Sequence, residues 1–205
     1  LASCLRSDTA AIVSAIRDVS SRGGGTVIVP SMNGEVFYTA ALRLESNVNL
    51  EIEEGAVLKF ASDTRLYVGD LMKSLYGQNG GTDEDGLTLT RFESVELMNY
   101  SPFIYAKDCK NIALTGRGTL DGQCSVGSWH RWNERIDKNV VGIEKDKLDL
   151  FRSIQEPSRL RLFKEGQLGV PVRERKYGEA SGSELSFCDD GFLRPNFIQF
   201  YGCQN

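Results

Sequence analysis

A short repeated unit limits what this chain can fold into. Each copy contains an asparagine, a few alternating apolar and polar residues, a glycine and a second alternation. Copies occupy residues 46–60 and 109–122, and a third one opens at Cys203-Gln204-Asn205. Alternation with a period of two indicates a strand with one buried face, as for Val48, Leu50 and Ile52. The units are too short for crossover helices, and the few Asn-Gly and Asp-Gly pairs, such as Asp121-Gly122, are isolated and do not form the regular turns of a hairpin meander, so the pattern predicts stacked parallel strands.

A helix is predicted before the first unit, over residues 8–22. Asp8 or Ser7 can cap it, and three glycines from Gly23 to Gly25 end it. Its apolar stripe consists of Ala10, Ile12, Val13, Ile16 and Val19. Thr26 to Pro30 follows as a buried strand, and short strands are predicted near 36–38, 42–44, 48–52 and 57–60. We therefore expect an all-β fold, a right-handed parallel β-helix whose open end is capped by the helix.

The predicted domain covers residues 1–205 as a single β-helix, and 40% hydrophobic and 25% charged residues are an ordinary globular balance. Long loop insertions are expected at about 67–91 and 123–192, where the alternation is lost. The unit that opens at Cys203 has no second half, so the β-helix is expected to be incomplete at its C-terminal end. An uncapped rung of this kind exposes apolar residues and favours self-association.

Composition excludes several partners and cofactors. The net charge is −4 and no basic stripe is interleaved with aromatic residues, which argues against nucleic acid. No apolar run is long enough to span a membrane. Five cysteines without a C-x-x-C pair and a single histidine, His130, predict no metal site, and no cofactor motif is present. Cys109 and Cys203 occupy matching positions of two units, where they form either stacked core thiols or part of a disulfide.

Five segments resemble glycoside hydrolase family 28, the polygalacturonase family of pectin-degrading enzymes. They are residues 23–30, 44–50 with 53–56, 92–105, 111–122 and 193–199. The most specific parts are Glu96-Leu97-Met98-Asn99-Tyr100-Ser101-Pro102, Gly116-Arg117-Gly118-Thr119-Leu120-Asp121-Gly122 and Leu193-Arg194-Pro195, which are similar to the branch that includes bacterial exo-acting members. The resemblance implies a pectin-lyase-like solenoid and a pectic polysaccharide or oligogalacturonide as substrate. Because family members that meet pectin are usually exported, it also implies an extracellular or periplasmic location.

The resemblance further implies inverting hydrolysis, in which one carboxylic acid protonates the glycosidic oxygen and a carboxylate about 6.5–9.5 Å away activates water. The family places this chemistry in Asn-Thr-Asp, Asp-Asp, Gly-His-Gly and Arg-Ile-Lys motifs. Three of these motifs are absent from the sequence. The one Asp-Asp pair, Asp189-Asp190, precedes Leu193, where the family has a glycine-rich loop, and is predicted to be solvated. We thus expect no catalytic residue in this chain and no activity from these 205 residues alone.

A tryptophan cluster is one candidate for sugar contact. Trp129, His130 and Trp132 lie close together, and the family commonly carries tryptophans near this point. An indole face can stack on the C–H surface of a sugar while its N–H donates a hydrogen bond. The alternative is packing within a loop.

Other candidate substrate-binding residues lie in two of the resembling segments or directly before one of them. Arg91, Glu93, Asn99 and Tyr100 could reach a saccharide, or could form turns and pack. Arg194 could hold a uronate carboxylate in a bidentate fork, or could pair with a neighbouring acid to fix its loop.

Two other functions remain open at this stage. A polysaccharide lyase on the same fold would need a calcium-binding acidic cluster and a base for the α-proton, and the sequence contains no evident cluster of that kind. A β-helical carbohydrate-binding or adhesion module would need no catalytic motif at all.

Overall fold

The computed structural model describes residues 2–32, 36–77, 81–125, 129, 155–178, 191 and 193–205, with side chains from Asp8 onward. Several sequence predictions lie outside the described residues: His130, Trp132, Asp189 and Asp190. No described helix is long and apolar enough to cross a membrane.

Helix α1 (Ala2–Ser21) begins before the predicted start at residue 8, so Asp8 lies inside the helix and is not its cap. The Asp8 carboxylate instead accepts a hydrogen bond from the backbone N–H of Tyr38 at 3.0 Å. Ile12, Val13 and Ile16 of the predicted stripe are buried, whereas Ala10 is exposed. The helix packs against β1, β2 and β3, the first strand of each of three sheets.

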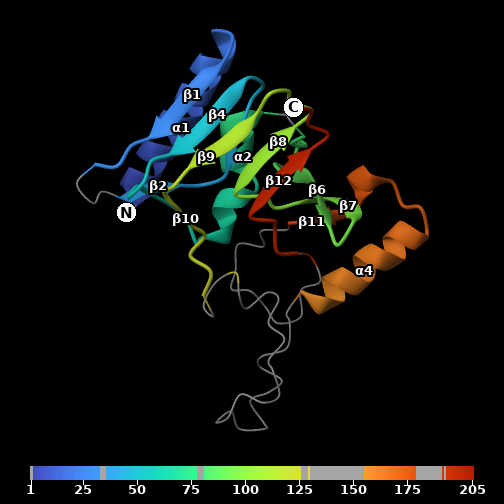
Figure 1. Ribbon diagram of the computed structural model, residues 1–205. Coiled ribbons are helices and arrows are strands. Elements are labelled where there is room, and N and C mark those ends of the chain that lie inside the picture. Colours follow the sequence, from blue (N-terminus) through green and yellow to red (C-terminus); the bar gives the residue numbers. More distant parts are fainter. Residues whose placement is uncertain are drawn as a thin grey trace, which may run out of the picture.

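Nine strands form three parallel sheets of three strands each. The sheets consist of β1 (Gly25–Val29), β4 (Val48–Ile52) and β9 (Ala113–Gly116); β2 (Val36–Thr39), β5 (Val57–Phe60) and β10 (Thr119–Asp121); and β3 (Leu42–Arg43), β8 (Ile104–Lys107) and β12 (Ile198–Tyr201). The chain passes through these sheets in the same order three times, which gives the rungs β1-β2-β3, β4-β5-β8 and β9-β10-β12 (Figure 1). The predicted parallel, strand-rich fold is thus confirmed, while its right-handed closure stays a prediction.

The predicted alternation is seen in β4, where Val48, Leu50 and Ile52 are buried and the residues between them are partly exposed. In β1 only Val27 and Val29 are buried, and Ile28 is 50% exposed. The prediction of a buried first strand thus holds for one face of β1 only, because the other face is turned away from the core.

The repeated asparagines lie at one corner of the stack, between the β3-β8-β12 sheet and the β1-β4-β9 sheet. We call this the asparagine corner (Asn47, Asn111 and Asn205). Asn111 donates from Nδ2 to Oδ1 of Asn47 at 3.0 Å, and Oδ1 of Asn205 accepts from the N–H of Ile112 at 3.0 Å. Asn47 and Asn111 have φ of 66° and 52°, a left-handed conformation that asparagine tolerates better than most residues. The repeat thus supplies side chains that link each rung to the next.

A second corner, between the β2-β5-β10 and β3-β8-β12 sheets, carries two long insertions, and we call it the insertion corner. The first insertion joins β5 to β8 and contains η1 (Thr64–Tyr67), α2 (Asp70–Tyr76), β6 (Thr88–Phe92) and β7 (Val95–Asn99). The second joins β10 to β12 and contains α4 (Glu156–Gln167), η3 (Val172–Glu174) and β11 (Lys176–Tyr177). The insertions meet in a small sheet in which β11 pairs with β7, and α4 lies beside β7 (Figure 1).

Strands β6 and β7 form an antiparallel hairpin that the sequence did not indicate. Its turn residues Glu93 and Ser94 have φ of 45° and 75°, the backbone of a two-residue hairpin turn with both φ angles positive. Such turns favour Asn-Gly, and Glu-Ser carries no such signal. The segment expected as a loop at 67–91 therefore contains α2 and most of β6.

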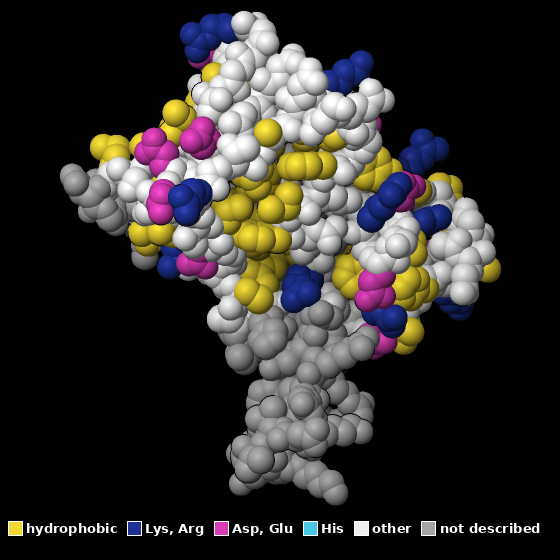
Figure 2. All heavy atoms as spheres, viewed as in Figure 1, with side chains coloured by type: hydrophobic (Ala, Val, Ile, Leu, Met, Phe, Trp, Pro, Cys, Tyr) yellow, Lys and Arg dark blue, Asp and Glu magenta, His cyan; other side chains and the backbone are white. Residues whose placement is uncertain are grey.

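The third rung exposes part of the apolar interior. Ile198 and Phe200 are in register with the buried Ile104 and Ala106 of β8, yet they are 40% and 42% exposed. Figure 2 shows hydrophobic side chains gathered between β9 and β12 on this face. Self-association through this rung stays a prediction. The thiols of Cys109, Cys124 and Cys203 are free.

Candidate functional site

A cavity of about 360 Å³ lies where the second insertion leaves β10 and returns to β12. We call it the Arg194 pocket. Its lining consists of Phe103, Gly122, Cys124, Trp129, Arg194, Pro195, Asn196 and Phe197. Two residues predicted from separate sequence segments, Trp129 and Arg194, are therefore brought together here.

An aromatic cluster forms the apolar side of the Arg194 pocket, and Phe103 is its centre. The ring of Phe103 lies 5.1 Å from Trp129 and 5.2 Å from Phe197, centroid to centroid. Trp129 also meets Tyr67 edge to face at 5.1 Å and is only 2% exposed, so its ring packs in the cluster. Phe197 is 38% exposed and is the ring that a ligand can reach. Neither Phe103 nor Phe197 was singled out from sequence, because an isolated phenylalanine is more often a core residue than a site residue.

Arg194 supplies the charge of the pocket. Its side chain is partly buried, and no carboxylate lies within ion-pair distance of its guanidinium among the residues that the structure describes. The predicted alternative, in which a neighbouring acid fixes Arg194, is not seen within this part of the chain. A planar guanidinium beside an exposed aromatic ring suits a ligand that has both a carboxylate and an apolar surface.

Two buried carboxamides hold the peptide group before Arg194. Asn99, at the end of β7, donates from Nδ2 to the carbonyl oxygen of Leu193 at 3.0 Å. Gln155, immediately before α4, accepts at Oε1 from the N–H of Arg194 at 2.8 Å. Leu193 C=O and Arg194 N–H belong to the same peptide group, and the two carboxamides are 1% and 2% exposed. The backbone of Arg194 is thus fixed by one residue from each insertion.

The other predicted contact residues lie outside this pocket. Glu93, at the hairpin turn, accepts from Nε of Arg159 at 2.9 Å. Asn99 and Tyr100 are buried, and burial raises the pKa of the Tyr100 phenol to about 12. Asn99 therefore positions Arg194 through the backbone in this structure and does not face a ligand. Gln155, which has the same role, was missed because a single glutamine forms no sequence pattern.

Arg91 joins a network that ties the hairpin to the third rung. Its Nη2 lies 3.1 Å from Oε1 of Glu96, and its guanidinium lies 5.0 Å from the centroid of the Tyr201 ring. The Tyr201 hydroxyl donates to the same oxygen of Glu96. These two hydrogen bonds, that of Tyr201 first, lower the pKa of the Glu96 carboxyl below its usual range. Asn196 of the Arg194 pocket donates to the carbonyl of Arg91 at 2.9 Å, so the network and the pocket are adjacent.

The residues that line the Arg194 pocket determine which interactions it can make. Its described lining offers a guanidinium, a carboxamide and aromatic rings, but no carboxyl or imidazole group that could transfer a proton. Among the described residues no group of three or more His, Cys, Asp or Glu could hold a metal ion. The described lining can thus donate charged and neutral hydrogen bonds and offers an apolar contact surface.

Comparison with solved structures finds a hyperthermoactive exopolygalacturonase from Thermotoga maritima. It matches with a TM-score of 0.66 and 32% sequence identity, over 95% of this chain and 35% of that chain. The chain thus spans about a third of the length of that protein. A candidate glycosyl hydrolase from Parabacteroides merdae matches with a TM-score of 0.37 and 26% identity, over 57% of this chain and 37% of that chain, which is too low to support an argument. No protein-family model matches the sequence, and no curated protein does.

These findings define the class of fold. The parallel three-strand sheets and the similarity to an exopolygalacturonase give the chain a pectin-lyase-like fold of the kind found in glycoside hydrolases.

Proposed function

We propose that this chain is part of a polygalacturonase-like hydrolase of glycoside hydrolase family 28, with a right-handed parallel β-helix fold. The whole protein would cleave α-linked galacturonan with inversion, and the Arg194 pocket would hold one uronate residue of the substrate. The observation that carries the proposal is the side chain of Arg194, which has no acidic partner among the described residues and lines a pocket together with Phe197.

The packing of the resembling segments supports this proposal. Residues 96–102 and 193–195 carry the most specific resemblance to the polygalacturonase family, and they are far apart in the sequence. In the structure they meet through the hydrogen bond between Asn99 and the Leu193 carbonyl. The two segments that resemble the family therefore build one local structure, and this structure fixes the backbone of Arg194.

A uronate ring fits the chemistry of the Arg194 pocket. The guanidinium can donate two parallel hydrogen bonds to the C6 carboxylate, while the C–H face of the sugar lies on the exposed ring of Phe197. A neutral sugar would leave the guanidinium without an anion. The pocket would therefore bind uronate units of the polymer in preference to neutral sugar units. The carboxylates that protonate the glycosidic oxygen and activate water would come from outside the pocket, which supplies binding and orientation.

The proposal is tested with polygalacturonate and the protein that contains this chain. Hydrolysis produces new reducing ends without ultraviolet absorbance, whereas a lyase produces an absorbing unsaturated end. Retained affinity without either product indicates a binding module.

A second test addresses Arg194 directly in the 205-residue chain. Arg194→Gln is expected to weaken digalacturonate binding about tenfold or more, and Arg194→Lys to restore part of it, because a charged hydrogen bond contributes about 1.5–3 kcal/mol. Equal affinity of wild type and Arg194→Gln for digalacturonate would contradict this role.

A further inference from the structure

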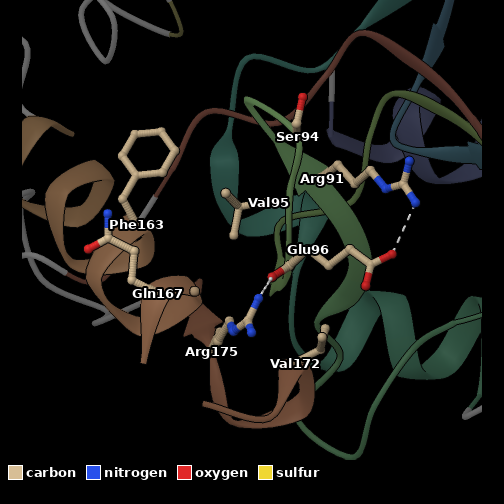
Figure 3. A pocket seen from close by; sticks show the side chains of 9 residues that line it. Arg91, Ser94, Val95, Glu96, Phe163, Gln167, Val172 and Arg175 are labelled. Carbon is tan, nitrogen blue, oxygen red and sulfur yellow. Dashed lines mark hydrogen bonds and ion pairs between the residues drawn. The ribbon is translucent and has the colours of Figure 1, made fainter. Parts of the chain in front are cut away.

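A second cavity, of about 490 Å³, lies between the two insertions and shares no lining residue with the Arg194 pocket. Figure 3 shows the hairpin β6–β7 on one side of it and α4 on the other. We call it the hairpin–helix cleft, and it is lined by Arg91, Ser94, Val95, Glu96, Phe163, Gly166, Gln167, Val172 and Arg175. The proposed function assigns no role to it.

Arg175 is the main cationic group of the cleft. Its Nε donates to the carbonyl of Val170 at 2.8 Å and its Nη1 to the carbonyl of Glu96 at 3.1 Å. These neutral carbonyls orient the guanidinium, and its charge also acts on the Glu96 carboxyl, whose pKa it helps to lower. Among the described residues no carboxylate lies within ion-pair distance of Arg175. An oriented guanidinium without an acidic partner is suited to an anionic ligand.

Glu96 provides the complementary acceptor. Arg91 and Tyr201 both bind its Oε1, whereas Oε2 receives no hydrogen bond from the described residues. A phosphate or sulfate ion would be repelled by this carboxylate. A sugar acid, in contrast, presents a carboxylate on one side and hydroxyl groups on the other, which matches a guanidinium and a free carboxylate oxygen in one cleft.

The remaining lining also suits a sugar. Val95, Phe163 and Val172 supply a small apolar surface, and Ser94 and Gln167 add a hydroxyl and a carboxamide. Gly166 permits the close approach of α4 to the hairpin, because a Cβ there would lie 3.3 Å from Cγ1 of Val95. Polar groups around a limited apolar surface are typical of carbohydrate recognition rather than of a lipid or drug-like site.

We propose that the hairpin–helix cleft is a second contact site for the galacturonan chain, in which Arg175 binds a uronate carboxylate and Oε2 of Glu96 accepts a sugar hydroxyl. This inference rests on the proposed function, since it takes the same polymer as ligand. The two sites are neighbours, because Asn196 of the Arg194 pocket donates to the carbonyl of Arg91, which lines the cleft. A polymer held at both sites binds more tightly than one held at either, since the second contact is intramolecular.

The test uses octagalacturonate and the 205-residue chain, with the dissociation constant measured by calorimetry. Ser94→Asp adds a negative charge at the exposed hairpin turn, and among the described residues it breaks no side-chain hydrogen bond of Ser94. Ser94→Asn is its neutral match at a position where both residues tolerate a positive φ. We expect Ser94→Asp to weaken octagalacturonate binding about tenfold relative to Ser94→Asn, through repulsion of the uronate carboxylate.

Arg175→Gln gives an independent measurement, with Arg173→Gln as control, because Arg173 is exposed and does not line the cleft. A loss of about tenfold or more is expected for Arg175→Gln alone. If Arg175→Gln fails to fold, the comparison of Ser94→Asp with Ser94→Asn decides whether the cleft contacts the polymer.

The outcomes separate this inference from the proposed function. If wild type binds octagalacturonate, Arg194→Gln weakens binding, and both cleft variants equal their controls, the cleft proposal alone fails. If the cleft variants weaken binding and Arg194→Gln does not, the cleft proposal stands and the role of Arg194 fails. If wild type does not bind at all, both fail.

Discussion

Asn99 and Gln155 hold opposite sides of one peptide group, although one belongs to the first insertion and the other to the second. Asn99 donates to the carbonyl of Leu193 and Gln155 accepts from the N–H of Arg194, at 3.0 and 2.8 Å. The position of the Arg194 backbone therefore depends on both insertions at once.

Loss of the Asn99 carboxamide should affect both stability and binding. Asn99→Ala leaves the buried carbonyl of Leu193 without this donor, which we expect to cost about 1–3 kcal/mol of unfolding free energy, measured by urea denaturation. Digalacturonate binding should weaken as well, because Arg194 loses part of its support. Asn49→Ala is the control, since this residue accepts only from the exposed Thr115 hydroxyl, and its cost should stay within about 0.5 kcal/mol. An equal loss of unfolding free energy in Asn99→Ala and Asn49→Ala would contradict the role of Asn99 in positioning Arg194.

Trp129 should contribute to stability through its packing. Because it is buried against Tyr67 and Phe103, Trp129→Ala is expected to lower the unfolding free energy by about 3–5 kcal/mol. Trp129→Phe keeps an aromatic ring and should cost clearly less. A folded Trp129→Ala protein with unchanged stability and lost sugar binding would show instead that the indole is a contact surface.

Glu96 should make the attachment of the hairpin to the third rung sensitive to acid. Its folded pKa is lowered, chiefly by the Tyr201 hydroxyl and then by Arg91. Its stabilising effect is therefore fully present above the unfolded pKa of about 4.3 and is lost as the pH falls through the lower, folded pKa. Glu96→Gln should remove this part of the acid dependence below about pH 4.3 in unfolding measurements. Identical acid profiles for the two proteins would exclude this contribution.

Gly116 should be far less tolerant of a side chain than Gly169, although both have a positive φ. A Cβ at Gly116 would lie 1.9 Å from the carbonyl oxygen of Ile52 on the neighbouring rung, whereas nothing lies within 4 Å of one at Gly169. Gly169→Ala should cost about 1–2 kcal/mol from its backbone conformation alone. Gly116→Ala adds a steric conflict and should cost about 2–5 kcal/mol by chemical denaturation. Similar costs would mean that the rungs can separate locally.

The sequence predicted the strands of the two complete repeated units, β4, β5, β9 and β10, because apolar and polar residues alternate in those units. Val48, Leu50 and Ile52 alternate with polar residues, and this pattern depends only on which face meets the core. The start of α1 was not predictable in the same way. Asp8 has the residue type of a cap, but its carboxylate is used in a contact with β2 that only the folded chain creates.

The candidate site was predictable only in part for the same reason. Arg194 and Trp129 were chosen by residue type and resemblance, and the structure places them in one pocket. The hairpin β6–β7 was missed because Glu93 and Ser94 adopt a turn without asparagine or glycine. Gln155 acts through a contact between distant segments, and no local pattern indicates such a contact.

The separation of the two corners has a consequence for how this chain tolerates change. The asparagine corner sets the spacing between successive rungs, and both insertions leave from the insertion corner. A longer or shorter insertion therefore shifts no strand against its neighbour. The rungs and the insertions occupy separate stretches of the sequence, so under the proposed function new ligand preferences can arise by exchanging whole insertions while the rungs stay as they are.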